Sequence, residues 1–312
     1  MFEKIRKKII VNTVSFIISR IDYKQYFRFF ENKGFHVTPV NFYQPIPDTT
    51  TLKDDLWKKQ SELVGININE KNQINLLSLF STRFKGEYSN FPRNKTAIPY
   101  QYYVDNGAFE SVDGEILYCM IRHLKPKKIT EVGSGFSTLL SAQAVLKNIE
   151  DDSSYECELT AIEPYPNEIL VKGFPGFSKL LTKRVQEVPL SEFEKLREND
   201  ILFIDSSHVL KIGSDVHYEY LEILPRLGKG VVIHAHDIFL PAEYPREWVL
   251  KEYWFWTEQY LLQAFLSFNE VFEALWAGSY MHLKYPEELE AAFNSYNRNE
   301  RWPASFWMRK TK

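Results

Sequence analysis

A short run with two glycines, from Glu131 to Gly135, constrains the fold of this chain more than any other part of the sequence. It follows a short apolar segment, Lys128–Val132, and precedes a helix-like segment, Ser137–Lys147. A strand that ends in an acid, a turn that needs residues without a Cβ and a helix N-terminus together form the ligand cradle of an α/β sheet. The run therefore predicts a nucleotide-like ligand at the carboxyl end of a parallel strand.

Beyond residue 108 the sequence alternates between strand-like and helix-like segments. This rhythm predicts an α/β fold with a doubly wound, Rossmann-like sheet of seven strands. Strands are expected at Lys128–Val132, Glu158–Ile162, Lys179–Val185, Ile201–Ile204, Gly230–Ala235, Ala274–Lys284 and Ala304–Arg309. Helices are expected at Asp113–His123, Ser137–Lys147, Val216–Leu224 and Glu247–Phe268, with a short helical insertion at Pro286–Phe293.

The first 95 residues lack this alternation. Leu52–Val64 and Glu70–Phe84 have the pattern of helices, and a proline-punctuated stretch, Thr38–Asp48, is expected to run as an extended loop. We therefore expect two domains, a mostly helical N-terminal cap with an acceptor-side loop at residues 1–95 and a ligand-binding domain at residues 96–312.

Acidic residues stand at the carboxyl ends of four expected strands: Glu131, Glu163, Asp205 and Asp237. In a doubly wound sheet the ligand binds at these ends. Glu163 comes 30 residues after Gly133, where an acid can accept hydrogen bonds from both ribose hydroxyls of an adenosine group. A turn-forming acid at a strand end also has local reasons to be there, so a structural reading stays open for each residue.

Two polar clusters follow the fourth and fifth expected strands. Asp205 and His208 follow one strand, and His236 and Asp237 follow the other. If these strands are neighbours, the two carboxylates lie close together and repel unless a cation neutralises them. Hard divalent ions prefer oxygen ligands, and an added imidazole also permits manganese, iron or zinc. We therefore expect a divalent cation at Asp205, His236 and Asp237, with a metal-free, hydrogen-bonded acid pair as the alternative.

The pattern Glu-x-Gly-x-Gly resembles motif I of the class I S-adenosylmethionine (SAM) methyltransferases, since Thr138 stands where a dinucleotide fingerprint carries its third glycine. The resemblance covers roughly residues 105–312 and implies SAM as the cofactor. It also implies that Val185–Glu187 flanks the adenine. The implied cofactor-binding residues are Glu131, Gly133, Ser134, Gly135, Ser137, Thr138, Glu163, Asp205 and Ser206.

Three residues narrow the resemblance to the metal-dependent O-methyltransferases of the catechol and the macrocin or mycinamicin sugar types. Those enzymes carry an Asp after strand four, a basic residue three positions later and an acidic ligand after strand five, which Asp205, His208 and Asp237 match. The resemblance implies methyl transfer to a hydroxyl, with Asp205 and His208 as catalytic residues and Mg²⁺ or Mn²⁺ as the cation. His208 would act as the general base, because a neutral imidazole accepts a proton near neutral pH. Two residues depart from the family pattern: His236 stands where an acid might be expected, and Ile238 stands where the catechol enzymes carry Asn.

An aromatic and proline-rich segment follows Asp237 and would line an acceptor pocket. Aromatic rings suit the apolar face of a sugar, and 15% of this chain is aromatic. Tyr43, Tyr244 and Arg246 are the candidate acceptor-binding residues. We therefore expect a small-molecule or glycan-linked acceptor that carries a sugar hydroxyl, although packing in a helix core would also explain much of the aromatic run.

Charge and cysteine content bound the partners and the compartment. A net charge of −3 gives no electrostatic basis for binding nucleic acid. Two cysteines without metal-binding spacing, and the lack of a secretory leader, favour the cytoplasm. Apolar residues at helical spacing from Ile5 to Ile21, beside basic residues, could hold the chain to a membrane surface. The alternatives are packing on the chain's own domain or in a homodimer.

Two rival functions use the same features. An NAD-dependent oxidoreductase would use the glycine turn and Glu163, but its Tyr-x-x-x-Lys pair, Tyr280 and Lys284, falls in a segment expected to be extended. Such a pair cooperates only when a helix brings the two side chains to one face. The second rival is a catalytically silent protein of the SAM-binding fold that acts as a scaffold on a membrane surface through residues 1–28.

Overall fold

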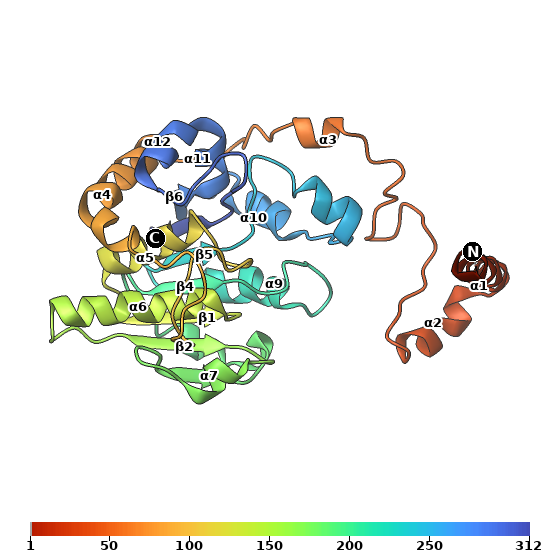
Figure 1. The fold of residues 1–312 in the computed structure, drawn as a ribbon, viewed down its shortest axis with the longest axis horizontal. Coiled ribbons are helices and arrows are strands. Elements are labelled where there is room, and N and C mark those ends of the chain that lie inside the picture. Colours follow the sequence, from red (N-terminus) through yellow and green to blue (C-terminus); the bar gives the residue numbers. More distant parts are fainter. Residues whose placement is uncertain (1) are drawn as a thin grey trace. The chain divides into compact units, whose positions relative to one another are not determined.

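The computed structural model describes residues 2–312, and the chain divides into two compact units, Met1–Asp54 and Asp55–Lys312. The first unit contains helices α1 (Phe2–Ile18) and α2 (Tyr23–Glu31), followed by an extended segment (Figure 1). Asp22 caps α2, because its carboxylate accepts a hydrogen bond from the Lys24 amide at 3.0 Å. None of residues 6–54 is buried.

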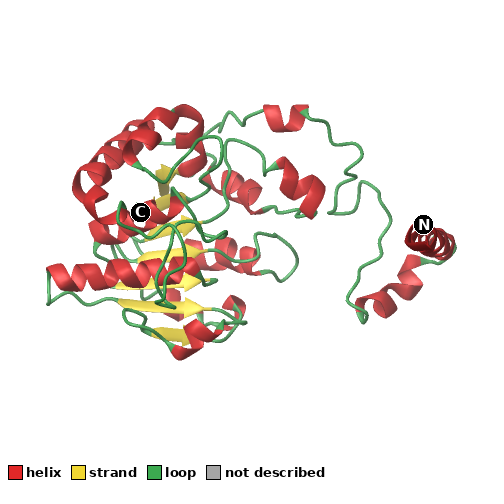
Figure 2. Cartoon of the chain, viewed as in Figure 1, coloured by secondary structure: helices red, strands yellow, loops and turns green. Residues whose placement is uncertain are grey.

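A sheet, drawn in yellow in Figure 2, forms the centre of the second unit. It has seven strands in the order β3-β2-β1-β4-β5-β7-β6. The strands are β1 (Lys128–Val132), β2 (Glu158–Ile162), β3 (Lys179–Leu181), β4 (Ile201–Ile204), β5 (Val232–Ala235), β6 (Phe272–Ala277) and β7 (Phe306–Lys310). Strand β7 runs antiparallel to both of its neighbours. The predicted Rossmann-like fold is confirmed, and so is the predicted contact between the fourth and fifth strands, where Ile204 pairs with Ala235.

The second unit also contains helices, most of which pack on one face or the other of this sheet. They are α3 (Asp55–Lys58), α4 (Glu70–Tyr88), α5 (Asp113–Leu124), α6 (Phe136–Asp151), α7 (Glu168–Lys172), α8 (Leu190–Phe193), α9 (Asp215–Tyr218), α10 (Glu258–Leu266), α11 (Gly278–Lys284) and α12 (Pro286–Ala292), with shorter turns η1 (Val185–Glu187), η2 (Glu219–Ile223), η3 (Leu224–Arg226) and η4 (Trp248–Glu252). The two faces belong to different hydrophobic clusters, so that Ile201 and Phe203 face one cluster while Leu202 and Ile204 face the other. A strand buried on both faces explains the continuous apolar run at this point of the sequence.

Helix α4 packs against α5 and α12 of the second unit. The division of the chain therefore lies at residue 54, upstream of the expected domain boundary at residue 95. No helix in the described part of the chain is long and apolar enough to span a bilayer.

The predicted helix at Leu52–Val64 is wrong beyond its first half. Only Asp55–Lys58 is helical, and the chain then runs extended beside the loop after β5, where the Ser61 amide donates to the Pro241 carbonyl at 2.7 Å. This tertiary hydrogen bond replaces the helical one that the local sequence favours.

The predicted helix at Glu247–Phe268 is also interrupted. The turn η4 ends at Tyr253, whose φ of 59° is left-handed, and α10 begins only at Glu258. Between them the chain is extended, and the amides of Thr257 and Glu258 donate to the His208 carbonyl at 2.9 and 3.1 Å. A long-range contact that the local pattern does not contain therefore breaks the helix.

Two expected strands are shorter than predicted. Strand β3 ends at Leu181, and Val185–Glu187 forms the turn η1. Strand β6 ends at Ala277, and the rest of the expected strand Ala274–Lys284 is helix α11.

Candidate functional site

The loop after β1 is built around Gly133. Its φ is +81°, and a Cβ placed there would lie 1.8 Å from the carbonyl oxygen of Asp205. Only glycine fits this backbone and this close approach. A Cβ at Gly135 would meet no atom within 4 Å, so this residue borders open space at the start of α6. The loop thus leaves room for a ligand beside a helix N-terminus, as the sequence motif predicts.

Three residues predicted to bind the cofactor instead make hydrogen bonds that hold this loop against the start of α6. Glu131 accepts a hydrogen bond from the Ser137 hydroxyl, and the Thr138 hydroxyl accepts one from the Gly135 amide at 3.0 Å. All three side chains are buried. Burial raises the pKa of Glu131 to about 8 despite the hydrogen bonds from Ser137 and Thr138. These residues shape the loop and do not line the cavity above it.

The first cavity, of about 460 Å³, lies at the carboxyl ends of β1, β2 and β4. Four of the predicted cofactor-binding residues line it: Gly133, Glu163, Asp205 and Ser206, together with Val185 and Gln186 of the segment expected to flank an adenine. The hydroxyl of Ser134 is buried without a hydrogen-bond partner in the described structure. A glycine loop, an orphaned hydroxyl and an acid one strand away are features that fit an adenosyl ligand.

The second cavity, of about 590 Å³, lies beside the first. Its apolar wall consists of Phe239, Pro245, Trp248, Trp254, Trp256 and Trp302, and its polar side includes Glu110, Asp113, Asp205, His236, Asp237 and Arg301. Asp205 lines both cavities. The two cavities therefore meet at the end of β4.

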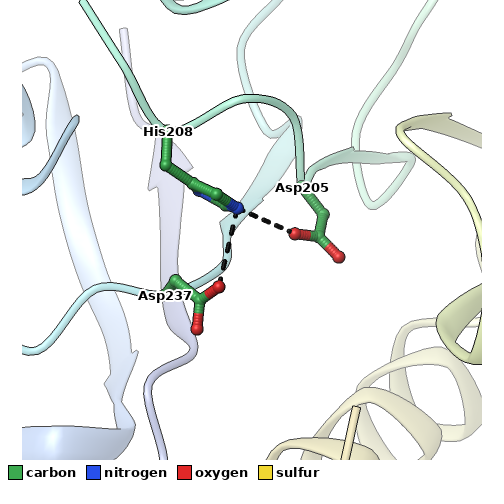
Figure 3. Close-up of side chains that lie close together, drawn as sticks. All are labelled: Asp205, His208 and Asp237. Atoms are coloured by element: carbon green, nitrogen blue, oxygen red, sulfur yellow. Dashed lines mark ion pairs between the residues drawn. The ribbon is translucent and has the colours of Figure 1, made fainter. Parts of the chain in front are cut away.

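Three side chains converge at this junction, as Figure 3 shows. The Nε2 atom of His208 points between two carboxylates and lies 3.3 Å from Asp205 Oδ1 and 3.5 Å from Asp237 Oδ2. The other ring nitrogen, Nδ1, is 2.9 Å from Glu258 Oε2. His208 and Asp237 both have left-handed backbones, with φ of 59° and 54°. Non-glycine residues in this conformation often mark functional sites.

The charges of the cluster shift its acid–base behaviour. Burial alone would lower the pKa of His208, but its hydrogen bonds to Asp205 and Glu258 and the charge of Asp237 outweigh burial and raise that pKa. Burial would raise the pKa of Asp205, but the nearby His236 and His208 outweigh it and hold that pKa at about 2. For Asp237, burial dominates over the two histidines and raises the pKa. A protonated His208 thus balances the carboxylates when no other cation is near.

The same three residues form the candidate cation site. One ligand atom from each of Asp205, His208 and Asp237 lies within 4.8 Å of the other two. Two carboxylates and an imidazole suit Mn²⁺ and, with water, Mg²⁺. The predicted third ligand, His236, lies outside this group, with its Nε2 3.8 Å from Asp237 Oδ1 and its Nδ1 buried without a partner in the described structure. The imidazole next to the two carboxylates is therefore that of His208, whereas His236 was the predicted ligand.

Two of the predicted acceptor residues, Tyr244 and Arg246, do not line the second cavity. Tyr244 is 2% exposed, its hydroxyl accepts a hydrogen bond from the Gln259 amide at 3.1 Å, and it packs behind Trp256. The guanidinium of Arg246 lies over the ring of Trp57 at 5.6 Å. Neither residue lines the cavity. Tyr43 belongs to the first unit, so its role stays a prediction.

Sequence reasoning missed several residues that the structure adds to the site. Arg301 and Trp302 line the second cavity from the loop before β7, and Glu110 lines it from the loop before α5. The signal for Trp302 was its position just before the last strand, because an antiparallel strand begins at the edge where its parallel neighbour ends. Glu258 carried no local signal.

The rival Tyr-x-x-x-Lys pair lies on helix α11, so the predicted extended conformation is wrong. The hydroxyl of Tyr280 donates to Glu70 on α4. Neither Tyr280 nor Lys284 lines either cavity. Its position, and not its backbone conformation, therefore separates this pair from the site.

Comparisons with known proteins give a family match over part of the chain and several similar proteins. A family model described as a methyltransferase domain matches residues 130–238. An uncharacterized protein of Archaeoglobus fulgidus is 33% identical over 171 residues, which cover 52% of this chain and 75% of that protein. Among solved structures, an O-methyltransferase from Bacillus cereus in complex with S-adenosylhomocysteine (SAH) is 13% identical with a TM-score of 0.38, covering 78% of this chain and 91% of that one. The apo structure of CmcI-N160 is 12% identical with a TM-score of 0.38, covering 73% and 84%. The residues matched by the family model run from the glycine loop to Asp237.

Proposed function

Since residues 130–238 of this chain match a methyltransferase-domain family, we propose that it transfers the methyl group of SAM to a hydroxyl oxygen of a sugar or of a glycan-linked small molecule. The observation that carries the proposal is the position of Asp205, which lines both cavities. A donor in the first cavity and an acceptor in the second would meet at this residue. Methyl transfer needs such an in-line approach more than it needs covalent help from the protein.

The first cavity is assigned to the donor. Gly133 lines this cavity, Glu163 would accept hydrogen bonds from the ribose, and Val185 and Gln186 also border the cavity. Bound SAM supplies a methyl group that is already activated on a sulfonium. The task left to the protein is to hold the acceptor hydroxyl in line and to remove its proton.

His208 is assigned the role of general base. The hydroxyl proton passes to Nε2 while the new O–C bond forms and the S–C bond breaks, which leaves a methyl ether and SAH. Nδ1 is already engaged with Glu258, so Nε2 is the nitrogen that faces Asp205 and Asp237. The three carboxylates around His208 favour its protonated form, and a further positive charge beside it would favour the neutral form that a base requires.

A divalent cation at Asp205 and Asp237 is the second part of the proposal. The donor set fits Mn²⁺ or Mg²⁺, and a cation held there would lower the pKa of an acceptor hydroxyl beside it. Nε2 of His208 can either ligate this cation or accept the proton, because it has one lone pair. The fit of His208 to the cation site therefore makes ligation the second candidate role for this residue.

The sugar acceptor rests on the wall of the second cavity. Trp254 and Trp256 stack at 5.2 Å with an interplanar angle of 8°, and Trp248 meets both edge-on. Flat aromatic surfaces pack against the C–H faces of a sugar ring, while the acids and Arg301 on the opposite side can bond its hydroxyls. This combination favours a neutral, hydroxyl-rich ring over a wholly apolar acceptor.

The main test measures label transfer from methyl-tritiated SAM to a panel of methyl glycosides. We expect His208→Ala to reduce transfer by at least about 100-fold with unchanged SAH affinity in calorimetry. His217→Ala is the matched control, since His217 is exposed on α9. Equal transfer by the His208 variant would remove the base from the mechanism. A protein that binds NAD in place of SAH would overturn the whole assignment.

A Mn²⁺ titration followed by electron paramagnetic resonance tests the cation. We expect Asp237→Asn to weaken Mn²⁺ binding at least about tenfold, while Asp152→Asn, at an exposed position, leaves it unchanged. If His208→Ala loses transfer but keeps Mn²⁺ affinity, His208 is the base. If it loses both, His208 is a ligand. Full transfer after dialysis against a chelator, with no metal in elemental analysis, would count against a cation.

A further inference from the structure

Glu258 is a buried acid that touches the base from behind. It is the first residue of α10 and its side chain is fully buried. Both carboxylate oxygens are engaged, since Oε2 lies 2.9 Å from His208 Nδ1 and Oε1 accepts a hydrogen bond from the buried Tyr220 hydroxyl at 2.9 Å. Among the described residues, His208 is the one ion-pair partner that the structure gives it. A buried carboxylate is costly unless it is paired, so this acid and this imidazole belong together.

The backbone reinforces the contact. The amides of Thr257 and Glu258 both donate to the carbonyl of His208, and the Thr257 hydroxyl accepts a hydrogen bond from the Leu210 amide at 2.8 Å. His208 has a left-handed φ of 59°, which costs a residue with a side chain some free energy. The chain around Glu258 therefore fixes both the backbone and the ring of His208.

We infer that Glu258 is a positioning residue for His208: its carboxylate keeps the neutral ring protonated on Nδ1 and so directs the Nε2 lone pair toward Asp205 and Asp237. Both ring nitrogens face carboxylates, which only accept hydrogen bonds, but the shortest contact is at Nδ1, 2.9 Å from Glu258 Oε2 against 3.3 and 3.5 Å at Nε2. The proton of the neutral ring therefore lies on Nδ1. Without this acceptor, the carboxylates of Asp205 and Asp237 would draw the proton to Nε2 instead. This inference rests on the proposed role of His208 and deepens it.

The same segment also carries the wall of the acceptor cavity. Trp256, two residues before Glu258, lines that cavity, and its ring lies 4.4 Å from the ring of His208. An acceptor that packs against Trp256 therefore contacts the segment that orients the base. Trp256 in the acceptor wall and Glu258 behind the base thus lie on one short segment, and both contact the ring of His208.

The test is the tautomer of the His208 ring, read from long-range ¹H–¹⁵N spectra of the SAH-bound protein over a pH series that reaches the neutral ring. His208→Gln assigns the signals. In the native protein we expect Nδ1 to carry the proton. In Glu258→Met, which keeps the side chain large and removes both oxygens, we expect the ratio of the two tautomers to change about tenfold or more toward Nε2–H. Tyr220→Phe is the matched control, because it removes one partner of Glu258 and leaves the contact with His208.

Each outcome decides the inference. A native neutral ring protonated on Nε2 overturns it without any variant, so the test holds even if Glu258→Met does not fold. A folded Glu258→Met that keeps the Nδ1 proton also overturns it. An equal change in Tyr220→Phe would reassign the effect to the packing of α10. The spectra need no turnover, so a failed base assignment, seen as full methyl transfer by His208→Ala, is a separate result.

Discussion

The first cavity, proposed to hold the donor, and the second cavity, proposed to hold the acceptor, meet at Asp205 but are built by different means. They are called the donor cavity and the acceptor cavity below. The donor cavity uses the ends of neighbouring parallel strands and a glycine whose backbone leaves no room for a Cβ. The acceptor cavity uses large side chains from loops that are far apart in sequence, at residues 107–113, 236–256 and 300–304. The fold thus supplies the donor site through its backbone, whereas loop side chains decide what the acceptor site binds.

The largest effect is expected when the same substitution is made in the backbone of each cavity. Gly133 and Gly107 both have a φ of +81°, but only at Gly133 would a Cβ collide with backbone, at 1.8 Å from Asp205 O. We expect Gly133→Ala to reduce SAH affinity at least about 100-fold. For Gly107→Ala, at the rim of the acceptor cavity, we expect an SAH affinity within about twofold of the wild type, because the substitution adds backbone strain but no collision. Equal losses in calorimetry would end the distinction.

The buried acid under the donor loop predicts a pH dependence of stability. The pKa of Glu131 rises from 4.5 to about 8 in the folded protein, so the folded state holds a proton that the unfolded state loses between these values. Its contribution to stability is complete below pH 4.5 and is lost as the pH rises toward 8. Without SAM, we therefore expect the free energy of unfolding of Glu131→Gln at pH 8 to be higher than that of the wild type by on the order of a few kcal/mol. Urea unfolding should show little difference near pH 4.5, and a gap that is the same at both pH values would contradict the prediction.

Glu163 differs from Gly133 within the donor cavity, because it would bind the donor through its side chain. Its Oε1 already accepts a hydrogen bond from the Tyr165 amide at 2.8 Å, which fixes the carboxylate at the cavity wall. We expect Glu163→Gln to weaken SAH binding about tenfold, through weaker hydrogen bonds to the ribose hydroxyls. Glu168→Gln, at an exposed position on α7, is the calorimetric control. Unchanged SAH affinity in the Glu163 variant would show that Glu163 does not bind the ribose.

The smallest effect is expected at the acceptor wall. Trp254→Ala should weaken the binding of methyl glycosides about fivefold, seen as lost saturation transfer to sugar protons, and leave SAH affinity unchanged. Tyr253→Ala is the control, because Tyr253 is 64% exposed and does not line the cavity. A glycoside signal that survives in the Trp254 variant, or vanishes in both, would contradict a sugar-binding wall.

The sequence predicts the donor half well because its signals are local. Gly133 and Glu163 follow short apolar strands, and their positions at strand ends follow from the fold class alone. The same logic correctly places Asp205 next to Asp237, since adjacent parallel strands end at one edge of the sheet.

The acceptor half depends on contacts that no local pattern contains. Tyr244 and Trp254 look alike in the sequence, yet one packs behind the wall and the other lines it, because the chain leaves the helical path at Tyr253. That departure is tied to the hydrogen bonds that the following segment makes to His208, nearly 50 residues earlier. Glu258 likewise gains its role only from this pairing, which periodicity cannot reveal.

The antiparallel insertion of β7 between β5 and β6 has a consequence for the order of assembly. All strands that border the donor cavity precede residue 206, whereas Arg301 and Trp302 enter the acceptor cavity only with the segment that leads into β7. On the ribosome, domains fold as their segments emerge. A nascent chain can therefore form its glycine loop while the neighbouring wall is still open, and that wall is completed last, when β7 pairs with β5 and β6.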